Sequence, residues 1–217
     1  MRAPVPSVPA EDTDPALIRS ASPVATARVA GWVLTVAGAL GLTASLVLTI
    51  EKFSLLADPT YRPSCSINPV ISCGSIMSSP QAEAFGFPNP LLGIIGFTVA
   101  LTTGVVTLAG ALLPRWYWIG LSAGLIAATA FVHWLIFQSL YRIGALCPYC
   151  MLVWAVTVVS LWYVLLHTGA RARNPGRPLP RWVKAAAQHH TLVLTIWVLI
   201  IAALIAEAFW VYWQTLI

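Results

Sequence analysis

The 217-residue sequence predicts an all-α integral membrane protein with several transmembrane helices. Apolar residues make up 59% of the chain and charged residues only 9%, whereas charged residues make up about 25% of a typical soluble domain. This composition excludes a soluble globule, and it also excludes a disordered chain, because disordered segments are poor in apolar residues. The apolar residues form long uninterrupted runs, which favours helices over the short alternating strands of a membrane β-barrel. Lipid offers the backbone no hydrogen-bond partners, so each run is expected to form a helix.

Five apolar runs are each long enough to cross a bilayer, which requires about 20 residues. They comprise residues 29–50, 91–113, 116–140, 147–166 and 191–213. The first run has 22 uncharged residues and exceeds the core of a signal peptide, about 7–15 residues, so it is expected to remain as a membrane helix. Before it, residues 1–28 are expected to form a flexible polar tail that contains several prolines. Residues 167–190 are expected to form a basic linker to the fifth transmembrane helix, within residues 191–217.

The distribution of lysines and arginines predicts the orientation of these spans. With the N-terminus in the cytoplasm, nine basic residues fall in cytoplasmic segments and three in extracytoplasmic segments. This difference follows the positive-inside rule and predicts a cytoplasmic tail and a cytoplasmic linker. It also explains the net charge of +5 without a nucleic-acid partner, because the basic residues lie next to the apolar runs. The loop 51–90 and the connection 141–146 are then extracytoplasmic, and all four cysteines lie in or beside them.

Cys147 and Cys150 form a Cys-Pro-Tyr-Cys motif at the expected start of the fourth span. Pro148 suits the first position of a helix, where its missing N–H costs no hydrogen bond. Residues three apart share a helix face, so the two sulfurs can reach each other, and the positive end of the helix dipole favours a thiolate. These features favour a redox-active dithiol. A structural disulfide and two buried free thiols are the alternatives that fit the same spacing.

Cys65 and Cys73 are separated by seven residues within the loop 51–90, where such a pair most often forms a structural disulfide. Zinc ligands are usually about two to four residues apart within a pair, so this spacing argues against a zinc site, and no metal is expected. Two cysteine pairs on one membrane face suggest a disulfide relay, in which thiol–disulfide exchange passes oxidising equivalents between the pairs. A relay requires a final electron acceptor, and a helical bundle in lipid can admit a hydrophobic quinone.

A short helix is expected after Cys73, with Ser79 as its N-cap and Pro80 as its first residue. It is expected to lie in the membrane interface, with Phe85 turned toward the lipid or the bundle. There it would cover the region near the motif formed by Cys147 and Cys150, here called the CXXC motif. In the third span, His133 is an ionisable residue within the membrane and therefore a functional hypothesis. It could donate a proton to a quinone, and a neutral, hydrogen-bonded histidine of the bundle is the alternative.

The order of these motifs resembles the vitamin K epoxide reductase family, in its bacterial branch. The loop cysteine pair comes first, followed by Ser79 and the Phe85-Gly86-Phe87-Pro88 segment, and the CXXC motif opens a late helix. The resemblance covers residues 29–166. It implies a four-helix transmembrane bundle with a quinone pocket, the fifth helix being peripheral, in the bacterial cytoplasmic (inner) membrane.

The resemblance also implies a role for each cysteine. Cys147 and Cys150 become the catalytic pair, with Cys150 nearest the quinone. Cys65 would face the external thiol protein, and Cys73 would pass oxidising equivalents outward from the catalytic pair. The pocket for a quinone of the menaquinone or ubiquinone type is expected to involve Cys150, Trp154, Ser79, Phe85, Phe87 and His133.

Two departures from the family pattern bear on the expected reaction. Many bacterial members carry a fused thioredoxin-like domain, whereas this chain ends at Ile217 after its fifth span, so a separate extracytoplasmic thioredoxin-fold (DsbA-like) protein is the expected partner. Vertebrate members have a tyrosine where this chain has Trp154, and the missing hydroxyl favours quinone reduction over epoxide reduction. The expected function is therefore a membrane oxidoreductase that oxidises the partner and reduces a quinone.

Two alternative functions differ from this one in observable ways. A DsbB-type oxidase performs similar chemistry, but in that family the CXXC-type pair precedes the widely spaced pair, and here it follows. A non-enzymatic membrane scaffold would hold the cysteines in two inert disulfides. A mild reductant would open neither of them, because structural disulfides have lower reduction potentials than redox-active ones.

Overall fold

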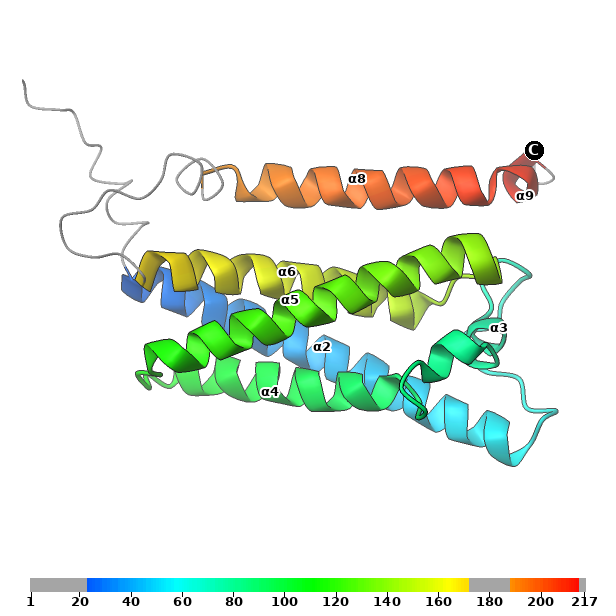
Figure 1. The fold of residues 1–217 in the computed structure, drawn as a ribbon, viewed down its shortest axis with the longest axis horizontal. Coiled ribbons are helices and arrows are strands. Elements are labelled where there is room, and N and C mark those ends of the chain that lie inside the picture. The colour runs from blue at the N-terminus through cyan, green and yellow to red at the C-terminus, as the bar shows by residue number, and fades with distance from the viewer. Residues whose placement is uncertain (1–22, 172–187, 215–217) are drawn as a thin grey trace, which may run out of the picture.

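The computed structural model describes residues 23–171 and 188–214 (Figure 1). The expected flexible tail up to residue 22, most of the basic linker and residues 215–217 lie outside the described residues. The elements, in chain order, are α2 (Pro23–Ala57), α3 (Cys73–Met77), the 3₁₀ helix η1 (Pro80–Glu83), α4 (Pro90–Leu108), α5 (Arg115–Gln138), the π-helical turn η2 (Ser139–Ile143), α6 (Pro148–Arg171), α8 (His190–Ala208) and α9 (Trp210–Gln214).

The predicted all-α membrane architecture is confirmed, and the described residues contain no strand. Five helices are long and apolar enough to cross a membrane, and each corresponds to one predicted run. They are Thr26–Ala57, Pro90–Leu108, Arg115–Ile143, Pro148–Arg171 and Thr191–Ala208. The order of long helices and short connections makes neighbouring spans antiparallel, so α3, η1 and the start of α6 gather at one end of the bundle, here called the cysteine end (Figure 1).

Several boundaries of the predicted spans differ from the structure: α6 continues to Arg171, into the predicted linker, and α8 ends at Ala208 instead of residue 213. The first helix begins at Pro23, inside the predicted tail, and continues to Ala57, so residues 51–57 are helical rather than part of the loop. These residues include no glycine or proline, and the helix ends just before Asp58-Pro59, where the residue preceding a proline disfavours helical geometry. The second span ends early, at Leu108, because Gly110 adopts a left-handed conformation with φ +90° and turns the chain.

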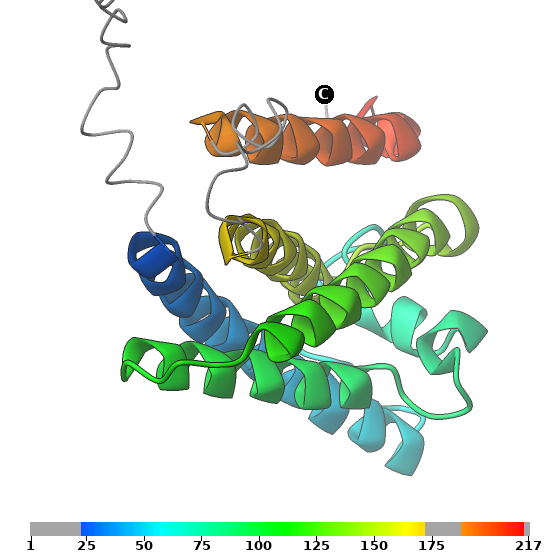
Figure 2. The same cartoon turned by 60° about the vertical axis from the view of Figure 1, so that its left-hand side comes forward.

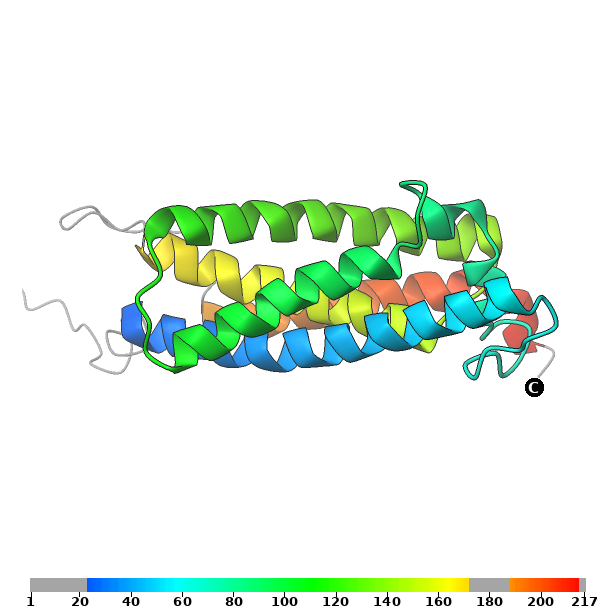
Figure 3. The ribbon, with the colours of Figure 1, turned by 90° about the horizontal axis from the view of Figure 1, so that it is seen from below.

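α2 packs along α4 and α6, and α5 packs against α6 (Figure 3). Glycines allow the close approach of α2 and α4. A Cβ built on Gly38 would lie 2.6 Å from the backbone nitrogen of Leu101, and one built on Gly104 would lie 2.5 Å from that of Thr35. Small residues at such contacts are typical of membrane helices, which associate through close packing.

The fifth helix, α8, is peripheral, as predicted (Figure 2). None of the most apolar window of this helix is buried. At its far end the buried Phe209 joins a core cluster with Val132, Ile136 and Trp154. Along its length, Trp197 Nε1 donates a hydrogen bond to a histidine of α5, described below, at 3.0 Å. α8 therefore packs on the outside of the bundle of α2, α4, α5 and α6, with residues from Trp197 to Ala208 against this cluster.

Candidate functional site

Backbone pairing ties the cysteine loop to the segment that precedes the CXXC motif. Leu146 N–H donates to the carbonyl of Val70 at 2.7 Å, and Ser72 N–H donates to the carbonyl of Leu146 at 3.0 Å, around an isolated bridge between Ile71 and Leu146. The side chain of Asn68 accepts hydrogen bonds from the N–H groups of Val70 and Ile71 and shapes the turn before this bridge. Because Cys73 and Cys147 each follow a paired residue directly, the bridge brings these two cysteines together.

Three sulfur atoms meet at this point. Cys65 and Cys73 form a disulfide with a Cα–Cα distance of 5.6 Å. Cys73 Sγ also lies 3.0 Å from Cys147 Sγ, and the sulfurs of all three residues lie within 4.8 Å of one another. Cys65, Cys73 and Cys147 are all buried. The thiol of Cys147 is therefore within reach of the Cys65–Cys73 disulfide. This distance allows thiol–disulfide exchange between the two groups.

Cys147 and Cys150 are free thiols at the start of α6. Pro148 is the first residue of this helix, as the sequence predicts. The pKa of the Cys147 thiol is lowered, chiefly because the Cys150 thiol donates a hydrogen bond to it, and the N–H groups of Cys150 and Tyr149 add to this effect. Burial and the charge of Glu51 act in the opposite direction. Since the thiolate is the reactive form, Cys147 is the more reactive thiol of the motif in this arrangement.

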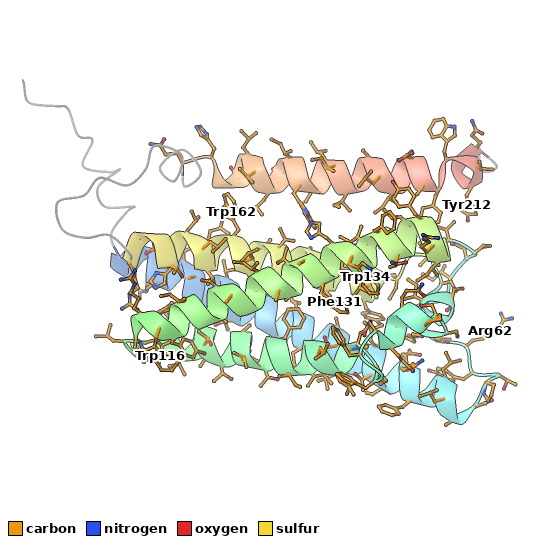
Figure 4. The ribbon with its side chains drawn as sticks, in the orientation of Figure 1. Arg62, Trp116, Phe131, Trp134, Trp162 and Tyr212 are labelled. Atoms are coloured by element: carbon orange, nitrogen blue, oxygen red, sulfur yellow. A yellow bond between two sulfur atoms is a disulfide. The ribbon has the colours of Figure 1, made fainter. Side chains whose placement is uncertain are left out.

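A cavity of about 740 Å³ lies inside the bundle and opens onto the sulfur cluster. α2, α4, α5 and α6 form its walls, and the α3–η1 segment covers its cysteine end. Cys73, Cys147 and Cys150 line it, and most of its other lining residues are apolar, such as Phe131 on α5 (Figure 4). Its volume lies within the range of small-molecule sites, about 300–1,000 Å³, which are also mainly apolar.

Four of the residues predicted to contact a quinone line this cavity: Cys150, Trp154, Ser79 and Phe85. Trp154 is buried, and its ring forms part of the wall one helical turn beyond Cys150. Ser79 occupies the N-cap position of η1, but its hydroxyl donates to the carbonyl of Ile76 at 2.7 Å instead of capping the helix. The predicted short helix begins at Pro80 and is a 3₁₀ helix rather than an α-helix.

Phe87 and His133 do not line the cavity, so the cavity does not support their predicted contact with a quinone. Gly86 adopts a left-handed conformation with φ +80°, and Phe87 follows this turn and stacks on Phe85 at the outer surface. His133 faces α8. Its Nε2 accepts the hydrogen bond from Trp197, so its Nδ1 donates to the carbonyl of Thr129 at 2.8 Å. This arrangement is the neutral, hydrogen-bonded histidine that was the alternative interpretation.

Glu51 and Lys52 are buried functional candidates that the sequence interpretation treated as loop residues. The carboxylate of Glu51 accepts hydrogen bonds from the hydroxyl and the N–H of Ser64, the residue before Cys65, at 2.6 Å and 3.2 Å. A hydrogen bond to the same carboxylate raises the pKa of the Tyr61 hydroxyl. Glu51 therefore anchors the loop at Cys65. The one available signal was the helix-forming sequence from residue 51 to residue 57, which carries these charges on past the apolar run.

Lys52 lies at the wall of the cavity and holds the covering segment. Its Nζ donates to the carbonyl of Met77, the last residue of α3, at 2.7 Å and forms an ion pair with Glu83 of η1 at 2.9 Å. The wall contains further polar residues, among them Asn89 and Gln138. The side-chain amide of Asn89 is bonded to the backbone of Gln81 and Ala84.

The sulfur cluster fits disulfide exchange better than metal binding. Cys65, Cys73 and Cys147 are close enough together to act as ligands of one ion. Thiolates bind metals, however, and two of the three sulfurs are bonded to each other in a disulfide. The remaining thiol, Cys147, cannot form a metal site alone.

Comparison with models of protein families identifies one match. The model described as the vitamin K epoxide reductase family matches residues 32–165, which is more than half of the chain. The matched range runs from α2 to α6, so it contains the four-helix bundle, the covering segment and all four cysteines, and it excludes α8.

Proposed function

The chain belongs to the vitamin K epoxide reductase family, and from this premise we propose that it oxidises a thioredoxin-fold (DsbA-like) dithiol protein and passes the electrons to a quinone. The family itself makes the chain a membrane-embedded thiol–disulfide oxidoreductase. The observation that carries the finer proposal is the 3.0 Å distance between Cys73 Sγ and Cys147 Sγ, which brings two cysteine pairs into direct exchange distance above an apolar cavity.

The first exchange oxidises the partner protein at the Cys65–Cys73 disulfide. A thiolate of the partner attacks Cys65, forms a mixed disulfide and releases Cys73 as a thiolate. The second thiol of the partner then attacks its own sulfur in the mixed disulfide, so the partner leaves oxidised and Cys65 leaves reduced. Because Cys65 is buried, this step requires its loop to move outward first.

The second exchange returns the oxidised state to the loop pair. The Cys73 thiolate attacks Cys147 in a Cys147–Cys150 disulfide, and Cys150 leaves and takes up a proton. Cys65 then attacks Cys73, which restores the Cys65–Cys73 bond and releases Cys147. The lowered pKa of Cys147 helps this last step, because a thiol of low pKa leaves faster. After this transfer the proposal expects a Cys65–Cys73 bond and two free thiols at Cys147 and Cys150, and the same bonding is present in the structure.

The last step oxidises the dithiol of Cys147 and Cys150, which form one S–S bond and lose two electrons and two protons. A bound quinone of the menaquinone or ubiquinone type would accept the two electrons and the two protons. The cavity fits a flat hydrophobic ring, since its walls are apolar and Cys150 and Trp154 lie on the same part of the α6 wall. Ser79 and Phe85, from the covering segment, would close the site above the ring.

We also propose that the cysteine end faces the extracytoplasmic side of a bacterial cytoplasmic membrane, with the N-terminus inside. The excess of basic residues on the opposite side of the five spans supports this orientation. An extracytoplasmic location also provides the oxidising environment in which exported proteins acquire disulfides.

The proposal is tested with the purified protein in detergent, a reduced thioredoxin-fold protein as electron donor and a short-chain ubiquinone as acceptor. We expect the quinone absorbance to fall with the wild-type protein, and not with Cys150→Ala, whichever donor is used. Cys65→Ala is the matched control. It should fail with the protein donor but remain active with dithiothreitol, which can reduce the CXXC pair directly. Undiminished turnover by Cys150→Ala would overturn the proposal.

A further inference from the structure

Lys52 places a positive charge at the sulfur end of the cavity. Its side chain is only 8% exposed, and it is one of the residues that line the cavity. Its Nζ donates to the backbone carbonyl of Met77, and the side chain of Met77 packs in one buried cluster with Cys73 and Cys147. The ammonium group therefore lies beside the segment that packs against the reactive sulfurs, in the wall of a mainly apolar cavity.

The partners of Lys52 leave one donor unused. An ammonium group has three N–H donors. The Met77 carbonyl takes one at 2.7 Å, and the Glu83 carboxylate takes another at 2.9 Å. The third donor has no partner within residues 23–171 and 188–214. Burying a charge is costly unless its hydrogen bonds are satisfied. An acceptor bound in the cavity would therefore stabilise this ammonium group.

The other polar side chains near this end are less suited to bind an anionic or strongly polar group. The Ser79 hydroxyl already donates to Ile76, and the Asn89 amide donates one N–H to Gln81; its second N–H is free among the described residues, but the amide is neutral. Gln138 has no hydrogen-bond partner in the described part of the chain, but its amide is neutral. Lys52 is thus the charged donor of the cavity wall.

We propose that Lys52 is a quinone-binding residue whose third N–H donor binds a ring carbonyl oxygen. This inference rests on the proposed function. Mainly apolar sites use a few convergent polar groups to orient their ligands, and a carbonyl oxygen is the acceptor that a quinone offers. The ammonium would also stabilise negative charge on that oxygen while electrons arrive from the dithiol. Lys52 keeps its own proton, because Cys147 and Cys150 together supply both protons and both electrons.

A purely structural role for Lys52 makes a different prediction. Its two observed bonds join α2 to α3 and to η1, so it could act only as a clip for the covering segment. In that case, removing its partner Glu83, which is 40% exposed and does not line the cavity, would weaken ligand binding in the same way. Glu83→Gln is therefore the matched control for Lys52→Met, which preserves side-chain length without the charge.

The test measures binding rather than turnover. Trp116 and Trp154 line the cavity, so a short-chain ubiquinone should quench the tryptophan fluorescence of the detergent-solubilised protein in a saturable way. We expect Lys52→Met to weaken this binding by about tenfold or more, as for loss of one charge-assisted hydrogen bond. Lys52→Arg and Glu83→Gln should stay within about threefold of the wild type, since both retain a cationic donor at position 52.

A second ligand distinguishes a specific loss of quinone binding from a general folding defect. A ring of the same size whose carbonyl oxygens are replaced by methoxy groups should bind wild type and Lys52→Met almost equally, so the loss is specific to the carbonyl. If Lys52→Met does not purify as a folded protein, Lys52→Gln, with a neutral donor, replaces it and should show an intermediate loss. Equal quinone affinity of wild type and either variant would overturn the inference, as would an equal loss in Glu83→Gln. No saturable quenching by the wild type would instead overturn the proposed quinone function, and this inference with it.

Discussion

We predict that Glu51 limits access to the Cys65–Cys73 disulfide and that replacing it makes that disulfide easier to reduce. Cys65 is 5% exposed and Cys73 is fully buried, so an external reductant reaches the bond only after the loop opens. The carboxylate of Glu51 holds the loop one residue before Cys65 through the hydroxyl and N–H of Ser64. Removing the carboxylate should therefore shift the local opening equilibrium without unfolding the bundle.

The size of the effect follows from these two contacts. The hydroxyl contact, at 2.6 Å, is a short hydrogen bond to a charged acceptor, and the N–H contact, at 3.2 Å, is long. Hydrogen bonds to charged groups contribute about 1.5–3 kcal/mol. Because Ser64 is exposed and water can replace the carboxylate, we expect the lower end, about 1.5 kcal/mol, which is about tenfold in the opening equilibrium.

The assay follows reduction of the disulfide by dithiothreitol, with alkylation and mass spectrometry of the loop peptide. Glu51→Ala should increase the rate about tenfold when the loop reopens and closes faster than it is reduced. Glu51→Gln should have a smaller effect, because it removes the charge but keeps an oxygen acceptor. Asp58→Ala is the control, because the Asp58 side chain accepts hydrogen bonds from Thr60 in the same loop and not from Ser64. The anchoring role would be refuted if the disulfide of Glu51→Ala were reduced at the wild-type rate, or if Asp58→Ala accelerated the reduction equally.

Three further predictions concern the cysteines and the histidine. Because the Cys150 thiol donates to Cys147 and lowers its pKa, Cys147 should become a thiolate at lower pH than an ordinary cysteine; in Cys150→Ala the midpoint of its iodoacetamide reaction should move to higher pH, and an unchanged midpoint would contradict the assignment. Cys73→Ser should accumulate a mixed disulfide between Cys65 and the partner on non-reducing gels, because the resolving thiol is absent, whereas accumulation in Cys65→Ser instead would reverse the roles of the two residues. His133→Ala should retain quinone reduction within about twofold of the wild type, because the side chain faces Trp197 of α8 and not the cavity; a large loss would return His133 to the site.

The transmembrane helices could be predicted from the sequence because their signal is local. Each run of about 20 apolar residues is sufficient by itself to define a span. The end of α2 could not be predicted in this way, because Glu51 and Lys52 look like the polar flank of a helix. They stay within it, buried, because residues distant in sequence satisfy them: Ser64 bonds Glu51, and Met77 and Glu83 bond Lys52. Tertiary contacts of this kind override the local expectation.

The site residues show the same difference between local signals and tertiary contacts. Trp154 lies one turn beyond the CXXC motif on the same helix, so helical periodicity carries it to the cavity. Phe87 and His133 were placed by resemblance and by chemical type. Their directions depend on the left-handed turn at Gly86 and on the docking of α8, neither of which leaves a signal in the spacing of residues.

The contact between Cys73 and Cys147 joins residues 74 positions apart, and its cause indicates why the two loop cysteines can have different roles. Cys73 directly follows the backbone pairing with Leu146, so it stays beside Cys147 as long as that pairing holds. The loop before Cys65 is held mainly through the side chain of Glu51, a contact that water can replace. The loop can therefore open at Cys65 while Cys73 remains in place. This difference supports the proposed division, in which Cys65 meets the partner and Cys73 exchanges with the CXXC pair.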